Sequence, residues 1–108
     1  NHTSCIIAVL DKLLASIKAD MSEIDIIAVD IGPGSFTGIR VGIASAKGLA
    51  QADNKSLIGI CSLESLCYKV YKEGILKAEI EYLVPFMDAK RGGVYTACCQ
   101  VIDNKLQI

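Results

Sequence analysis

Histidine is nearly absent from this sequence, and with it the usual means of building a catalytic or metal site. The 108 residues include a single histidine, His2. A Ser-His-Asp arrangement needs a histidine beside its serine, and none is present beyond His2. A mixed His/Cys metal cluster lacks its ligands for the same reason. Hydrolase chemistry is disfavoured, and the sequence predicts no catalytic residue, no metal ligand and no cofactor-binding residue.

Long apolar runs and clustered basic residues are also missing. No apolar run approaches the roughly 18 residues that a membrane span requires, so we expect no membrane partner. Lysine and arginine total 11 against 12 acidic residues, and they are scattered along the chain. Neutralising a phosphate backbone needs a clustered basic face. Any contact with RNA is therefore expected to be indirect.

The five cysteines lack the spacing of a metal or redox motif. Cys5, Cys61, Cys67, Cys98 and Cys99 contain no CxxC pair, and their number is odd. Without a signal peptide, this pattern indicates reduced thiols in a cytoplasmic protein. We expect them to behave as small, buried, apolar side chains.

Apolar residues, by contrast, make up 52% of the chain, which is enough for a folded core. Residues 3–19 carry apolar side chains at the spacing of one helical face. Residues 24–31 are β-branched and almost continuously apolar, which is typical of a strand covered on both faces of a parallel sheet. A helix over 36–51, a second buried strand over 57–61 and a helix from Ser62 to Gly74 follow. This alternation predicts the α/β class with parallel strands.

The pattern changes near residue 80. Residues 81–88, 94–102 and 106–108 are strand-like and are separated by short polar or glycine-containing segments. Such spacing predicts antiparallel hairpins. We therefore place a domain boundary within 75–81, with residues 1–78 in a first domain and 79–108 in a second.

A glycine-rich turn, Gly32-Pro33-Gly34-Ser35, joins the first strand to the second helix. Glycines permit unusual backbone angles, and Ser35 can cap the helix. A phosphate-binding GxxxxGK[ST] loop lacks its lysine here, a GxGxxG fingerprint lacks its third glycine, and a GxSxG elbow does not fit. A structural turn is the main interpretation, and a nucleotide-binding enzyme that uses this turn remains an alternative.

The helix after the turn keeps one side small, because Gly38, Gly42 and Ala46 are spaced by four. Each glycine within a helix costs about 0.8 to 1 kcal/mol relative to alanine, so a closely packed neighbour is indicated. That neighbour is this chain's own sheet or a helix of a partner chain, and the two alternatives are compatible on different faces of the helix. The partner alternative predicts an interface formed by the first two helices, consisting of Leu10, Leu13, Leu14, Ile17, Gly38, Ile39, Gly42, Ile43 and Ala46.

The segment from Asp25 to Ala50, which contains Ile-Gly-Pro-Gly-Ser-Phe-Thr-Gly-Ile-Arg, closely resembles the TsaB (YeaZ) family of bacterial proteins. His2-Thr3, Ser62-Leu63-Glu64 and the run from Met87 to Tyr95 extend the resemblance over essentially the whole chain. The last run is similar to the family's Asp-Ala-Arg-Arg-Gly-Glu-Val-Tyr, with Gly93 replacing the acidic residue. The family's three initial strands, with their Asp-Thr-Ser sequence, are missing, and so is much of its second domain. We therefore expect a fragment.

The resemblance implies a fragment of an actin-like, ribonuclease H-like fold of two similar domains. It also implies a non-catalytic partner of a TsaD-like catalytic subunit and a TsaE-like ATPase, which together place threonylcarbamoyl on adenosine 37 of tRNA. The family's first two helices are its surface for TsaD and for self-association, so a homodimer is expected in isolation. The family's older glycoprotease name supplies a further alternative, a peptidase. Nucleotide binding does not carry over, because the Asp-Thr-Ser strands are missing.

Overall fold

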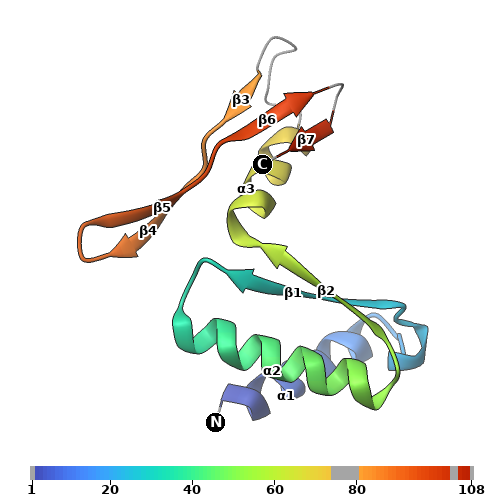
Figure 1. Cartoon of the computed structure of the whole chain (residues 1–108). Coiled ribbons are helices and arrows are strands. Elements are labelled where there is room, and N and C mark those ends of the chain that lie inside the picture. Colours follow the sequence, from blue (N-terminus) through green and yellow to red (C-terminus); the bar gives the residue numbers. More distant parts are fainter. Residues whose placement is uncertain (1, 74–80, 103–104, 108) are drawn as a thin grey trace. The chain divides into compact units, whose positions relative to one another are not determined.

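The protein forms two compact units, which we describe separately. The structure is a computed structural model that describes residues 2–73, 81–102 and 105–107 (Figure 1). The first unit comprises Asn1–Ile31 and Ser35–Gly59, and the second comprises Gly32–Gly34 and Ile60–Ile108. The predicted boundary between residues 78 and 79 lies outside the described residues and stays a prediction. By compactness, however, the third helix groups with the hairpins that follow it.

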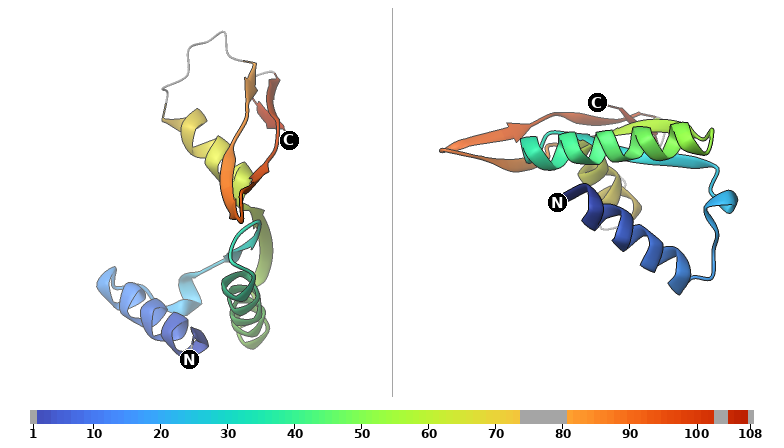
Figure 2. Two further views of the ribbon diagram at one scale, coloured as in Figure 1. Left: turned by 90° about the vertical axis from the view of Figure 1, so that its left-hand side faces the viewer. Right: turned by 90° about the horizontal axis from the view of Figure 1, so that it is seen from below.

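The first unit places two helices beside a two-stranded sheet. Its elements are α1 (His2–Ser16), the 3-10 turn η1 (Met21–Glu23), β1 (Ile26–Gly32), α2 (Phe36–Ala52) and β2 (Ser56–Cys61). β1 and β2 are neighbours in one sheet, and their arrows run in the same direction (Figure 1). α1 contacts α2, and the two helices cross at an oblique angle (Figure 2). The predicted order of helices and strands is confirmed.

Local hydrogen bonds explain where these elements begin. Asp20 and Glu23 form a capping box around η1, with the Asp20 backbone N–H donating to the Glu23 carboxylate at 2.7 Å. Ser35 is the N-cap of α2, and its Oγ accepts a hydrogen bond from the Gly38 N–H at 3.2 Å. These bonds satisfy N–H groups that the start of a helix leaves without intrahelical partners.

The expected burial of both strands on both faces is wrong. Along β1 exposed and half-buried residues alternate, with Ile27 and Val29 half-buried and Ile26 59% exposed. On β2, Leu57 and Ile58 are exposed. The physical reason is that, within the described residues of this unit, helices cover the sheet on one face only. Apolar composition alone did not distinguish a covered face from an open one.

The second unit consists of α3 (Ser62–Lys72) and five antiparallel strands. The strands are β3 (Tyr82–Leu83), β4 (Phe86–Lys90), β5 (Gly93–Thr96), β6 (Cys99–Ile102) and β7 (Lys105–Gln107). β4 and β5 form one hairpin, and a second sheet has the order β3-β6-β7. The predicted antiparallel hairpins are confirmed.

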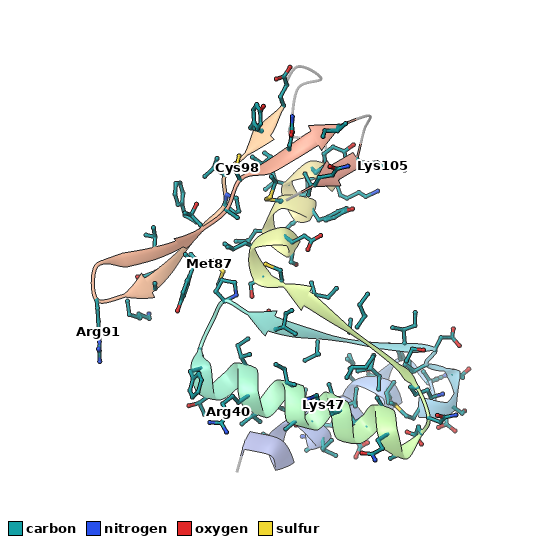
Figure 3. The ribbon with its side chains drawn as sticks, viewed as in Figure 1. Arg40, Lys47, Met87, Arg91, Cys98 and Lys105 are labelled. Atoms are coloured by element: carbon teal, nitrogen blue, oxygen red, sulfur yellow. A yellow bond between two sulfur atoms is a disulfide. The ribbon has the colours of Figure 1, made fainter. Side chains whose placement is uncertain are left out.

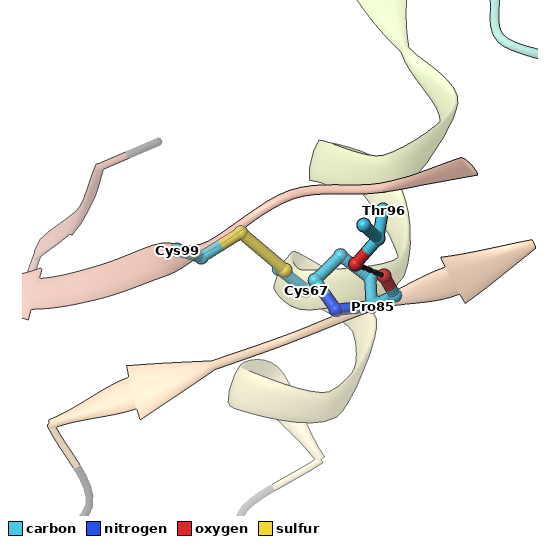
Figure 4. Close-up of a disulfide and its surroundings, with 4 residues drawn as sticks. All are labelled: Cys67, Pro85, Thr96 and Cys99. Carbon is cyan, nitrogen blue, oxygen red and sulfur yellow. Dashed lines mark hydrogen bonds between the residues drawn. A yellow bond between two sulfur atoms is a disulfide. The ribbon is translucent and has the colours of Figure 1, made fainter. Parts of the chain in front are cut away.

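Two of the predicted long strands are each divided between these sheets. Residues 81–88 break at Val84-Pro85, and residues 94–102 break between Thr96 and Cys99. Proline has no N–H to donate to a ladder, so pairing is interrupted beside Pro85. Thr96 Oγ1 instead donates to the Pro85 carbonyl oxygen at 2.9 Å (Figure 4).

The core of the second unit is centred on a disulfide that the sequence did not predict. Cys67 of α3 is bonded to Cys99 of β6 (Figure 4). Both cysteines are buried with Leu106, and Leu83 and Val101 pack against them. Cys5 and Cys98 are exposed free thiols, and Cys61 is half-buried. The expectation of five reduced, buried cysteines is therefore wrong. Their spacing gave no warning, because α3 and β6 are far apart in sequence.

Candidate functional site

The candidate site is the outer surface of α1 and α2. α1 carries two apolar stripes about a quarter turn apart around its axis. The half-buried stripe includes Leu10 and Leu14. We call the other one the outer stripe of α1. It consists of Ile6 (37% exposed), Val9 (64%) and Leu13 (56%), and of Ile17 (62%), which directly follows the last residue of the helix. Such a row of exposed apolar side chains is the kind of surface that another protein covers.

The small side of α2, by contrast, is covered largely by this chain itself. Ser45, Ala46 and Ala50 are each less than 9% exposed. A Cβ placed on Gly42 would lie 3.9 Å from Val29 Cγ2 of β1. Gly42 therefore faces the protein's own sheet, as one of the two alternatives for this helix requires. Ala46, which the sequence placed in the partner interface, is buried within the chain because it lies on this inner side.

Three further interface candidates on α2 are partly open. Ile39 and Ile43 are half-buried, and Gly38 is exposed. A Cβ on Gly38 would lie 3.4 Å from Ser35 Oγ, so the nearest obstacle there is the capping serine. Of the nine candidates, Leu13 and Ile17 present the largest apolar side chains to solvent.

The outer side of α2 combines an aromatic ring with cations. Phe36 is 74% exposed, and the Arg40 guanidinium carbon lies 5.2 Å from the centre of its ring. Arg40 and Lys47 both project from the side of α2 away from the strands (Figure 3). The contact between Arg40 and Phe36 is a cation–π interaction, which leaves the ring edge and the charge available to a partner.

The glycine turn has the geometry of a structural connection. Gly32 has a φ of 105°, which side chains other than glycine rarely adopt, and the Gly32–Pro33 peptide bond is cis. Gly34 follows, and Ser35 uses its hydroxyl to cap α2. Among the described residues, no group of three or more His, Cys, Asp or Glu side chains is placed to hold a metal ion. Nor is any described helix both long and apolar enough to cross a membrane.

Sequence reasoning missed Val9 and Phe36 and omitted Ile6 from the interface. The signal for Ile6 and Val9 was present, because Ile6, Val9, Leu13 and Ile17 recur at intervals of three and four residues. A second stripe beside Leu10 and Leu14 could have been recognised from that spacing. The sequence carried no such signal for the exposure of Phe36. Its exposure depends on how the first turn of α2 is placed relative to the rest of the unit.

The fold is that of an α/β domain, and comparison with family models assigns it to the TsaD type. The family model described as tRNA N6-adenosine threonylcarbamoyltransferase, TsaD, matches residues 1–108. The chain is 32% identical over 106 residues to the tRNA threonylcarbamoyladenosine biosynthesis protein TsaB of Haemophilus influenzae, covering 98% of this chain and 42% of that protein. It is 31% identical over 103 residues to TsaB of Escherichia coli, covering 95% and 43%.

Solved structures agree with these sequence relationships. YeaZ from Pseudomonas aeruginosa superimposes with a TM-score of 0.80 at 28% identity, covering 98% of this chain and 48% of that one. The chain belongs to the TsaB (YeaZ) family of tRNA threonylcarbamoyladenosine biosynthesis proteins. Its predicted class, a part of the two-domain fold of that family, is confirmed. The chain spans less than half the length of the curated TsaB relatives it matches.

Proposed function

We propose that the chain is part of a non-catalytic scaffold in tRNA threonylcarbamoyladenosine biosynthesis. Its first two helices pair with a TsaD-like catalytic subunit, and a TsaE-like ATPase completes the assembly that modifies adenosine 37 of tRNA. In isolation the same helices form a homodimer. The scaffold works in the cytoplasm and meets tRNA only through its partners. Membership of the TsaB family supports the pathway, and the helix surface supports the mode of action.

The observation that carries this proposal is the outer stripe of α1. Its members are more than one third exposed although all four are large and apolar. Burying one such side chain completely contributes about 1.5 to 3 kcal/mol, so covering Val9, Leu13 and Ile17 supplies a substantial part of a binding energy. Spacing by three and four residues is the pattern that packs into the groove of another helix.

Cations on the outer side of α2 favour a protein partner that carries acidic groups. Arg40 and Lys47 lie on the outer side of α2, and the Arg40 guanidinium contacts the ring of Phe36. Charges at an interface rim mainly set specificity and association rate, whereas buried apolar side chains supply affinity. We expect the apolar stripe to form the centre of the contact and the two cations to lie at its rim.

The test is a substitution on the stripe, made in the full-length protein. Leu13→Glu replaces a 56% exposed apolar side chain with a charge that association would bury. Since each 1.4 kcal/mol is tenfold in affinity, lost burial and an unpaired charge together are expected to weaken binding to the TsaD-like subunit at least about 100-fold. Titration calorimetry measures this change, and sedimentation velocity measures the homodimer.

Ala15→Glu is the matched control. Ala15 is exposed on α1 but lies away from the outer stripe, so the same charge is added without touching the proposed contact. Binding by this variant is expected to equal that of the unmodified protein. Equal binding by Leu13→Glu and Ala15→Glu, with both folded, would refute the helix surface as the docking site.

A further inference from the structure

The disulfide of the second unit lies in the hydrophobic core and not on the surface. Cys99 is 0% exposed and Cys67 is 2% exposed, and Leu83, Val101 and Leu106 surround the bond. The bond connects α3 to β6 across a sequence separation of 32 residues. It therefore closes a large loop through the middle of the unit's core.

The two cysteines differ in whether they border a cavity. Cys67 lines an apolar cavity of about 210 Å³, together with Leu66, Val70, Leu83, Val84 and Pro85. Cys99 does not line this cavity and has no exposed surface. Thiol–disulfide exchange requires a thiolate to reach one sulfur of the bond. Among the described residues, the cavity is bordered by Cys67 and not by Cys99, so the approach that it offers is to the Cys67 side.

We propose that the Cys67–Cys99 bond is a reversible redox cross-link, opened at Cys67 by a dithiol reductant that enters this cavity. A reductant thiolate attacks Cys67 Sγ, the S–S bond breaks, and Cys99 leaves as a thiolate that takes up a proton. The second reductant thiol then attacks the mixed disulfide and releases Cys67 as a thiol. The protein gains two electrons and two protons, and the reductant becomes a cyclic disulfide.

Reduction does not remove the residues from the core, because a free cysteine packs as a small apolar side chain. What reduction removes is the covalent constraint between α3 and β6. A disulfide that closes a loop of this length restricts the unfolded chain strongly, so the oxidised unit is the more stable form. Disulfides in a reducing compartment are usually transient or redox-sensing, which fits a bond that opens and closes.

Alkylation and peptide mass mapping of the full chain test the state of the bond directly. After incubation with oxidised glutathione, denaturation should expose three alkylatable thiols, at Cys5, Cys61 and Cys98; after dithiothreitol, all five should react. A brief exposure of the oxidised protein to reduced glutathione should place the adduct on the Cys67 peptide. Five free thiols under the oxidising condition, or an adduct mainly on Cys99, would overturn the proposal.

Thermal unfolding tests the consequence. Reduction is expected to lower the unfolding midpoint of the second unit by on the order of 10 °C. This response should be absent in Cys67→Ser and unchanged in Cys98→Ser, which removes the exposed neighbour of Cys99. A redox response that persists in Cys67→Ser, or disappears in Cys98→Ser, would contradict the assigned bond. Mass mapping of the unmodified chain decides the question even where Cys67→Ser does not fold.

Discussion

Substitutions at two glycines of α2 test whether the small side of this helix packs against the protein's own sheet or against a partner helix. A Cβ on Gly42 would lie 3.9 Å from Val29 Cγ2, whereas a Cβ on Gly48 would have nothing within 4 Å. An alanine fits at both positions, so Gly42→Ala and Gly48→Ala should each stabilise the chain by about 0.8 to 1 kcal/mol through helix propensity. Neither glycine is therefore explained by the volume of a single methyl group.

Leucine separates the two positions. At Gly48 its side chain extends into solvent, and Gly48→Leu should retain most of the gain in helix propensity. At Gly42 its branched end meets β1, and overpacking of this kind costs about 1 to 3 kcal/mol. We expect the free energy of unfolding of Gly42→Leu to fall below that of Gly48→Leu by about this difference.

Urea denaturation, followed by far-ultraviolet circular dichroism, measures these free energies in the full chain at concentrations below self-association. Comparing leucine at the two sites cancels its intrinsic helix propensity, so the difference reports packing against Val29. If Gly42→Leu proves as stable as Gly48→Leu, the glycine is not needed for the protein's own sheet. The partner-helix alternative for Gly42 would then be the better explanation.

Two further substitutions test local features of the first unit. Ser35→Ala removes the oxygen that accepts a hydrogen bond from the Gly38 N–H and should destabilise the chain by about 1 kcal/mol. Ser35→Asp should retain the cap. Thermal unfolding compares the two variants, and equal loss of stability in both would refute capping by this side chain. Gly59→Ala places a Cβ 2.8 Å from Ile31 Cγ2, so it should destabilise by about 1 to 3 kcal/mol. Adding Ile31→Ala should recover most of that loss in the same assay, and a loss unchanged in the double variant would contradict the contact.

The sequence predicted the order of elements because its apolar periods are strong and its turns are marked by glycine, aspartate and asparagine. Ser35 was identified as a helix cap from its position after Gly34, and the structure confirms that hydrogen bond. These are local features, determined by residues a few positions apart. Hairpins near the end of the chain were predicted for the same reason.

Features that depend on distant residues were not predicted. The exposure of Ile26 and Leu57 depends on how many layers cover the sheet, which no local pattern records. The contact between Cys67 and Cys99 arises only once α3 packs on β6. Within the candidate surface, the sequence did not determine whether Gly42 faces the protein's own sheet or a partner helix. The short distance between a Cβ at Gly42 and Val29 Cγ2 shows that it faces the sheet. The close packing expected on the small side of α2 is seen at Ser45, Ala46 and Ala50, whereas a Cβ on Gly48 would have nothing within 4 Å.

The two units differ in what holds them together, and this difference bears on the proposed scaffold. In the described part of the first unit, the buried side chains are Ser45, Ala46 and Ala50, all of them small. Each removes little apolar surface from water, while larger side chains such as Val9 and Leu13 remain exposed. Burial within this unit therefore leaves a large share of its potential apolar stabilisation unused.

A partner that covers the outer stripe would supply that missing stabilisation. Any molecule that binds the folded state alone stabilises it by an amount that grows with its concentration relative to its dissociation constant, about 2.7 kcal/mol at a hundredfold excess. Binding and folding of α1 and α2 are then linked, because the same apolar side chains serve both. A scaffold built in this way is most stable when assembled, and Leu13→Glu should lose that added stability while Ala15→Glu keeps it.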